Sequence, residues 1–534
     1  MFDALTFPYP SRRSLTYASR GMVATSQQLA AQAGLDILKR GGNAVDAAIA
    51  TAMALCVVEP CSNGLGGDMF AIVCKGGKLY GLNSSGPAPR AISLEAVRAL
   101  GHDEMPAYGL PPINVPGVSR GWARLSERFG KLPLIELAAP ALSYAEDGFP
   151  VSAVVAAGWA SAYKKASEHL KTDASVKDWF GSFAPKGRAP LPGETWVQRD
   201  QARSLRLIAL SGAKEFYEGE IAERIDAYMK EIGGYLRCED LAAFEPEWVE
   251  PVGVKYRGHE IWELPPNGQG LVASMALNIL RGVRLTSRDD AVDWHRQIEA
   301  MKLAFTDGKR HITDPKYMEA AVEDLLSDKL AEKRRALICD RAIDPDDVPF
   351  MDKGTVYLCA ADGDGMSVSF IQSNYESFGS FVAVPGLGIS LQNRGANFSL
   401  DPAHANRLEP GKRTYHTIIP AFLTKSGEPV GPFGVMGGFM QPQGHAQVIV
   451  NMLDYGLNPQ AALDAPRWQW LSGKRVSLEP GVPRRIADEL AGMGHEIEYA
   501  AEAGFGRGQI IMRNPLGGYI GATEPRADGA VVGW

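Results

Sequence analysis

Two spacings of apolar residues alternate along the chain, and the spacing typical of helices comes first. The run QQLAAQAGLDILKR after Thr25-Ser26 predicts a capped helix that stops at Gly41-Gly42. Asn43 then caps a second helix, AVDAAIATAMALCVV, which has almost no polar face and should therefore be buried. The turn NGLGGD follows, and then a hairpin whose turn is Lys75–Lys78.

From about residue 100 to residue 340 the pattern is mainly helical, and it changes at Cys339. The segment DRAIDPDDVPFMDKG, which ends at Gly354, is acidic and contains two prolines, so we expect it to be exposed and flexible. Directly after it, TVYLCAAD and MSVSFIQSN predict two strands joined by Gly363-Asp364-Gly365. Strands and helices thus occur in blocks, which favours packed sheets covered by helices over one doubly wound sheet.

The length and composition limit the classes of protein to consider. A chain of 534 residues predicts two or three domains or one large layered domain, and a net charge of -7 argues against a nucleic-acid partner. The longest apolar run, Ala44–Val58, is interrupted by Asp46 and Thr51, so we expect no membrane partner. The start lacks a signal-peptide pattern and the six cysteines lack CxxC spacing, so a cytoplasmic protein with buried, reduced thiols is expected.

The common metal and nucleotide motifs give no lead. HExxH, Walker A and GxGxxG sequences are absent. The nine histidines are dispersed without an H-x3-H pair, so neither a metal ion nor an organic cofactor is expected. We interpret His416 and His445 as hydrogen-bonded structural residues rather than ligands.

One junction in the sequence suggests a catalytic nucleophile. If the chain were cut between Gly354 and Thr355, Thr355 would carry a free amine at the start of an apolar strand. A threonine hydroxyl is a weak nucleophile until a base takes its proton, and an α-amino group with a pKa of roughly 7.7–8.0 can be that base. On this local pattern alone, an ordinary threonine that opens a strand remains the better interpretation.

Ten segments in a fixed order change that balance. Together they resemble the γ-glutamyltransferase family of N-terminal-nucleophile hydrolases along nearly the whole chain. The segments are GGNAVDAAIAT (41–51), NGLGGDMF (63–70), NVPGVSRGW (114–122), AEDGF (145–149), LPPNGQG (264–270), GTVYLCAADGDGMSVSFIQSN (354–374), FGS (378–380), LQNRGANFS (391–399), GVMGGF (434–439) and GATEPRADG (521–529).

The resemblance implies an α+β fold, a four-layer αββα sandwich of two antiparallel sheets covered by helices. It also implies a precursor that cuts itself into a large chain, residues 1–354, and a small chain, residues 355–534. The two chains would form a heterodimer, and two heterodimers could pair. Thr355 matches the family's nucleophile, and Gly437-Gly438 match its glycine pair, whose N–H groups bind the oxyanion. Asn374 matches an asparagine near the nucleophile, whereas Gln372 and Ser373 lie near the family's second threonine without a firm assignment.

The chain departs from the family at the substrate pocket. Ser85 replaces the carboxylate-binding arginine, Asn397 replaces the ammonium-binding aspartate, and His416-Thr417 replace a serine pair. Arg394 stands where the family has a neutral glutamine, and an arginine fork suits a carboxylate, which Asn374 and His416 could help to bind. The pocket is therefore expected to take an acyl group with a carboxylate and no amine, as in the branch of oxamate amidohydrolase and the cephalosporin-acylase-like proteins.

The first hypothesis is thus a self-processing amidohydrolase for the monoamide of a small dicarboxylic acid, with oxamate as the best single substrate. A second is a γ-glutamyl hydrolase or transferase that acts on glutathione. A third is an unprocessed, inactive relative that serves as a binding protein. A structural ion pair remains the alternative role for Arg394.

Overall fold

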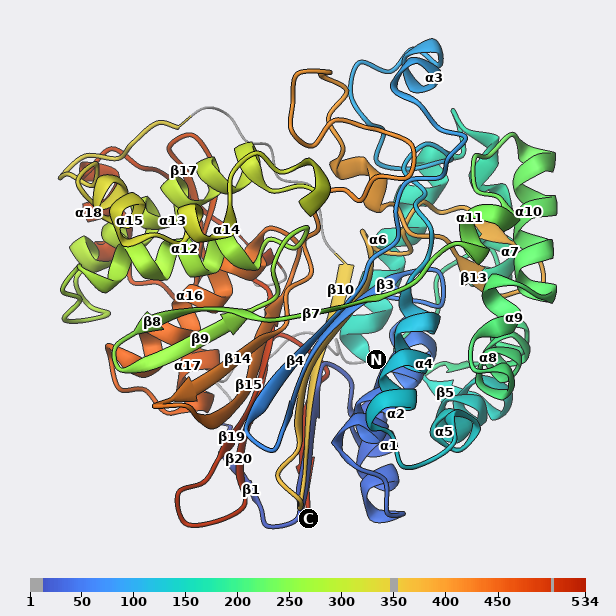
Figure 1. The fold of residues 1–534 in the computed structure, drawn as a ribbon, viewed down its shortest axis with the longest axis horizontal. Coiled ribbons are helices and arrows are strands. Elements are labelled where there is room, and N and C mark those ends of the chain that lie inside the picture. Colours follow the sequence, from blue (N-terminus) through green and yellow to red (C-terminus); the bar gives the residue numbers. More distant parts are fainter. Residues whose placement is uncertain (1–12, 346–353, 501–503) are drawn as a thin grey trace.

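The computed structural model of the protein contains two seven-stranded antiparallel sheets that are stacked with helices on both outer sides (Figure 1). It describes residues 13–345, 354–500 and 504–534. Sheet A has the strand order β1 (Thr16–Ala18), β20 (Tyr519–Thr523), β19 (Arg507–Arg513), β15 (Glu428–Met436), β14 (Ala421–Lys425), β9 (His259–Glu263) and β8 (Val252–Tyr256). Sheet B has the order β21 (Ala530–Gly533), β2 (Gly21–Thr25), β10 (Gly354–Asp362), β11 (Ser367–Tyr375), β3 (Asp68–Lys75), β4 (Lys78–Ser84) and β7 (Glu247–Val249).

Strand β10 lies near the middle of sheet B, between β2 and β11. It forms with β11 the hairpin that the sequence predicts, and every residue of both strands is buried. The burial on both faces follows from the layers, because α2 (Ala44–Val58) covers one face and sheet A covers the other. The first residues of β10 are therefore held by packing on two sides.

Helix α2 and its neighbours form the outer layer on sheet B, at the right of Figure 1. All of α2 is buried, and Asn43 and Asp46 close a capping box at its start, so both predictions for this helix are confirmed. The helices that pack with α2 are α1 (Gln28–Lys39), α4 (Val118–Phe129) and α5 (Leu134–Asp147), and α8 (Arg199–Ser211) packs on α5.

The opposite outer layer covers sheet A, at the left of Figure 1. Helix α12 (Gly270–Arg281) contacts β8 and β9, α16 (Met440–Leu453) contacts β15, and α13 (Ala291–His311) packs on α12. A third apolar layer lies between the sheets, where Phe70 and Tyr357 of sheet B join Phe422 and Ile511 of sheet A. These layers confirm the αββα sandwich and make one large layered unit.

The other elements lie around the rim of the sandwich. Two small sheets have two strands each: β5 (Phe149–Pro150) with β6 (Thr195–Trp196), and β12 (Ala383–Val384) with β13 (Ile389–Ser390). A third small sheet has three strands, β16 (Trp468–Ser472), β17 (Arg475–Leu478) and β18 (Glu496–Tyr499). The remaining helices are α3 (Leu94–Ala99), α6 (Ala153–His169), η1 (Ala174–Val176), α7 (Lys177–Phe183), α9 (Lys214–Tyr217), α10 (Glu220–Ile232), α11 (Cys238–Ala242), η2 (Pro315–Tyr317), α14 (Val322–Leu325), α15 (Asp328–Arg335), η3 (Arg394–Asn397), α17 (Pro459–Asp464) and α18 (Arg484–Gly492).

Two local expectations change. Helix α1 is capped by Gln27, whose side chain accepts from the N–H groups of Leu29 and Ala30, and Thr25-Ser26 belong to β2 and the turn after it. Of the six free cysteines, Cys339 is exposed and Cys238 is partly exposed, so the thiols are not all buried. Most of the predicted flexible segment, residues 346–353, lies outside the described residues. No helix in the described ranges is both long and apolar enough to cross a membrane.

Candidate active site

Thr355 is the second residue of β10 and is completely buried. Gly354 pairs with Tyr375 and Val356 pairs with Gln372, so the ladder is irregular at Thr355, where one residue of β10 faces two of β11. Such a bulge bends a strand and redirects a side chain. Here it places Thr355 against Ser373.

Three oxygen atoms meet at this bulge. Thr355 Oγ lies 2.7 Å from the Gly354 carbonyl oxygen and 3.0 Å from Ser373 Oγ. Ser373 Oγ lies 2.7 Å from the same carbonyl oxygen and accepts from the Tyr375 N–H at 2.7 Å. Each hydroxyl has one proton, so two of the three oxygen–oxygen contacts are hydrogen bonds at any time. When Thr355 donates to Ser373 and Ser373 donates to Gly354, the remaining contact is the close approach of Thr355 Oγ to the carbonyl group. A hydroxyl oxygen then lies beside a polarised carbonyl group.

Gly354 fits this site because it has no side chain. A Cβ atom there would lie 2.4 Å from the Ser377 nitrogen and 3.2 Å from the Cys61 carbonyl oxygen. No larger residue can enter without moving the backbone on both sides. The lack of a side chain thus allows Gly354 to place its own carbonyl group against Ser373 and Thr355.

Gly437 and Gly438 lie between the end of β15 and the start of α16. Their φ angles are 135° and 57°, values that side chains disfavour, and their carbonyl oxygens accept from the N–H groups of Met440 and Gln441. This arrangement places both glycines at the N-terminus of a 14-residue helix, where the field of the helix favours negative charge. The oxyanion role of the two glycines stays a prediction, with which this turn is compatible.

Arg394, in η3, is buried, and its Nη1 donates to Thr417 Oγ1 at 2.5 Å. Its Nε and Nη2 have no acceptor among the described residues. The guanidinium carbon lies 4.3 Å from the centre of the Tyr375 ring, and Tyr375 pairs with Gly354. Burial lowers the pKa of Arg394 to about 10, although the neighbouring carboxylate of Asp68 raises it, so the side chain is charged at neutral pH.

Asn397 contacts the other end of the same tyrosine. The Tyr375 hydroxyl donates to Asn397 Oδ1 at 2.9 Å, and Asn397 Nδ2 has no acceptor in the described part of the chain. Tyr375 has a φ of 81°, which is rare outside glycine, so its ring is held in an unusual direction. Arg394, Thr417 and Asn397, three of the predicted pocket residues, thus gather around Tyr375.

His416 faces a buried carboxylate. Its Nε2 lies 3.1 Å from Asp68 Oδ2, and its Nδ1 accepts from the Ile418 N–H, which makes it a neutral imidazole. Burial lowers the pKa of His416 well below its ordinary value. Burial also raises the pKa of Asp68 to about 7, against the opposing effect of Arg394 and of three further donors. His416 is the hydrogen-bonded residue we expected, as is His445, which bonds to Glu263 at 2.7 Å.

Two predicted site residues bond to other partners in this region. Ser85 Oγ donates to Asn83 Oδ1 at 2.7 Å, and within the described ranges it has no bond to Arg394. The amide of Asn374 lies against Gly64 and Gly67, where added Cβ atoms would come within 3.0 Å and 2.5 Å of it. Of the two β11 residues that face Thr355, Ser373 is the one whose side chain bonds to its hydroxyl.

The segment GVSRG, residues 117–121, matches the GxSxG pattern of serine hydrolases. Ser119 lies in the first turn of α4, not on a sharp turn between a strand and a helix, and its side chain is buried. The backbone therefore lacks the elbow that exposes such a nucleophile.

One group of possible metal ligands converges within the described residues, formed by His295, Glu299 and His495. Lys302 Nζ lies 2.8 Å from Glu299 Oε1, and the two imidazole rings bond to each other at 2.8 Å. The ammonium group already compensates the carboxylate, so these residues form a buried ion-pair network. That network holds the backbone at Cys339 and Ile343, ahead of the predicted cleavage site.

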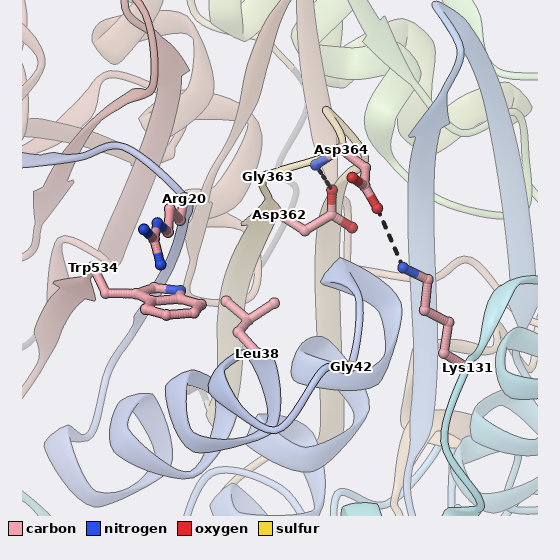
Figure 2. A pocket seen from close by; sticks show the side chains of 8 residues that line it. All are labelled: Arg20, Leu38, Gly42, Lys131, Asp362, Gly363, Asp364 and Trp534. Carbon is pink, nitrogen blue, oxygen red and sulfur yellow. Dashed lines mark hydrogen bonds and ion pairs between the residues drawn. The ribbon is translucent and has the colours of Figure 1, made fainter.

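A surface cavity of about 280 Å³ lies at the other end of β10 (Figure 2). Asp362 ends the strand there and lies seven positions after Thr355, which corresponds to about 23 Å of extended chain. Its polar side chains include the ion pair of Lys131 and Asp364 at 3.2 Å. The cavity is therefore remote from the hydroxyl cluster. Its lining residues are Arg20, Leu38, Gly42, Lys131, Asp362, Gly363, Asp364 and Trp534.

Comparison with known proteins decides the family. The profile of the gamma-glutamyltranspeptidase family matches residues 30–534. The chain belongs to this family. It is 37% identical over 531 residues to the glutathione hydrolase-like YwrD proenzyme of Bacillus subtilis (strain 168), covering 96% of this chain and 98% of that protein. It is 36% identical over 535 residues to the oxamate amidohydrolase proenzyme of Klebsiella pneumoniae subsp. pneumoniae, covering 98% and 100%.

A solved structure agrees with this assignment. The crystal structure of cephalosporin acylase from Bacillus halodurans has a TM-score of 0.96 and 57% sequence identity, and the match covers 100% of this chain and 99% of that one. The chain is thus an amide hydrolase of the gamma-glutamyltranspeptidase family, made as a proenzyme. Membership implies a small amide substrate and a heterodimer of processed chains.

Several polar groups of the site were not predicted as site residues. Asp68 lies in a motif that was used only for the resemblance, and Tyr375 follows the predicted strand that ends at Asn374. Gln269, whose side chain bonds to Thr417 and Gly438, was one letter of LPPNGQG. Spacing offers a signal for Ser373 only, because it lies directly across the hairpin from Thr355. The others are brought together by contacts between distant segments.

Proposed function

We propose that the chain cuts itself between Gly354 and Thr355, and that the freed Thr355 hydrolyses a small amide whose acyl group carries a carboxylate, with oxamate as the leading substrate. The cut would give a large chain of residues 1–354 and a small chain of residues 355–534. The contacts of Thr355 Oγ and Ser373 Oγ with the Gly354 carbonyl oxygen support this step.

The proposed substrate class rests on one edge of the Arg394 guanidinium group, which has no partner among the described residues. Its Nε and Nη2 form a parallel pair of donors with no acceptor among the described residues. In the same chain, the same edge of Arg334 binds both oxygens of Asp307, and that of Arg526 binds both oxygens of Glu479. A substrate carboxylate would satisfy Arg394 in the same way. Because no carboxylate in the described part of the chain occupies that edge, the structural ion pair is the weaker interpretation.

The proposed reaction uses the residues of the candidate active site described above. The α-amine of Thr355 takes the proton of Oγ, and Oγ attacks the amide carbon of the substrate. The N–H groups of Gly437 and Gly438 would bind the oxyanion, and Ser373 would orient the hydroxyl. The C–N bond breaks, the amine returns the proton to the leaving nitrogen, and ammonia departs from oxamate. Water then opens the ester and frees the dicarboxylate and Thr355.

The test compares two substrates and two arginine variants. Wild-type protein should release ammonia from oxamate faster than nitroaniline from a γ-glutamyl anilide. Arg394→Gln should raise KM for oxamate at least tenfold, and Arg394→Lys should raise it less, because lysine keeps the charge but loses the fork. Turnover of the anilide alone would favour the second candidate, a γ-glutamyl hydrolase, which the similarity to YwrD supports.

The remaining parts of the proposal concern assembly and location. We include a pair of heterodimers, which the mass of the native particle tests, and a cytoplasmic location, which the six free cysteines favour. A single full-length band on a denaturing gel would instead support an unprocessed binding protein.

A further inference from the structure

Two glutamine side chains connect the segment after Thr417, which bonds to Arg394, with the turn that contains the predicted oxyanion glycines. Gln269 Nε2 donates to the carbonyl oxygens of Thr417 at 2.7 Å and Gly438 at 2.9 Å. Gln441 Oε1 accepts from the Ile419 N–H at 3.0 Å. Gln441 lies in the first turn of α16, three residues after Gly438. Its side chain therefore lies between the two parts of the proposed site.

Only the oxygen atom of the Gln441 side-chain amide has a hydrogen-bond partner among the described residues. The residue is completely buried, and its Nε2 has no acceptor among the described residues. Turning the amide over would not help, because Nε2 would then face the Ile419 N–H, a second donor. A buried donor without an acceptor costs about 1–3 kcal/mol, so such a group needs an explanation.

Two further donors without acceptors lie in the same neighbourhood. Arg394 presents Nε and Nη2, and it is tied through Thr417 to Gln269 and Gly438. All of these groups are donors, so the ligand that satisfies them must supply several oxygen atoms. The monoamide of a dicarboxylic acid supplies three: two on its carboxylate and one on its amide.

We infer that Gln441 is a further substrate-binding residue, whose Nε2 donates to an oxygen atom of the substrate's acyl group. The inference rests on the proposed function and adds a specificity contact to it. Gln441 would favour acyl groups rich in oxygen over hydrocarbon acyl groups of the same size, because a hydrocarbon leaves the buried donor unsatisfied. Its Oε1 keeps the side chain in place through Ile419.

The test uses a substitution that keeps one half of the amide and removes the other. Gln441→Glu retains an oxygen for the Ile419 N–H but replaces the donor with a second oxygen, whereas Gln441→Met removes both. Both variants should cut themselves normally, and both should lose at least tenfold in kcat/KM for oxamate and in affinity for oxalate, the hydrolysis product. Lowering the pH should partly restore oxalate binding to Gln441→Glu, because a protonated carboxyl group donates again.

Gln443 supplies the matched control. It lies on the same helix and is buried, but Nε2 donates to the carbonyl oxygens of Phe439 and Trp470 and Oε1 accepts from the Trp470 N–H. Gln443→Glu should lower Tm without a selective loss of oxalate affinity. If Gln441→Glu binds oxalate and turns over oxamate within threefold of the wild type, the side chain is structural and the inference is wrong. If the wild type itself binds neither, the proposed function is wrong instead.

Discussion

Ser373 Oγ lies 3.0 Å from Thr355 Oγ and 2.7 Å from the carbonyl oxygen of the residue before it. One hydroxyl thus contacts both the proposed nucleophile and the bond it would cut. Before cleavage, the nitrogen of Thr355 is an amide and cannot act as a base. Ser373 is therefore placed to polarise the carbonyl group in the first reaction and to orient the hydroxyl in the second.

Removal of the Ser373 hydroxyl should slow self-cleavage. We expect Ser373→Ala to reduce the rate about 10²-fold, the cost of losing one donor to a developing oxyanion, and Ser373→Thr to keep most of it. The appearance of two bands on a denaturing gel over time measures the rate. Ser369→Ala is the matched control, because Ser369 is buried on the same strand but bonds to Tyr357. Equal rates for the two alanine variants would contradict the role of Ser373.

Thr355 itself should be required for the cut but not for folding. Thr355→Ala should stay one full-length chain, because no hydroxyl remains to attack the Gly354 carbonyl. Thr355→Ser keeps the hydroxyl and should still give two chains. Mass spectrometry of the small chain would locate the cut, and Tm would establish that the alanine variant folds. A cut at another bond, or cleavage of the alanine variant, would disprove the assignment.

The sequence predicted the layers and the central hairpin because these depend on local periodicity. Helix α2 lacks a polar face and is buried throughout, and the apolar pattern of β10 and β11 reflects burial on both sides. Gln27 escaped prediction because glutamine is an unusual cap, so Thr25-Ser26 gave the stronger local signal.

The residues of the site could be predicted only where they belong to a motif of the family. Thr355, Gly437 and Gly438 followed from the resemblance, and Arg394 stood out as a departure from it. The contacts of Tyr375 with Arg394 and Asn397 depend instead on a positive φ angle and on packing between β11 and η3. Ser373 stayed without an assignment because the bulge at Thr355 shifts the register, which periodicity does not report.

The pH dependence should distinguish amides that carry a carboxylate from those that do not. For every substrate, kcat/KM should rise as the α-amine loses its proton, near a pKa of roughly 7.7–8.0, because only the neutral amine is a base. Burial lowers the pKa of Arg394 to about 10, so its charge disappears above that pH. The KM for oxamate should then rise above pH 10, while an amide without a carboxylate should show no such limb. Protein returned to neutral pH must recover full activity, which excludes unfolding, and identical alkaline limbs for the two substrates would remove Arg394 from the site.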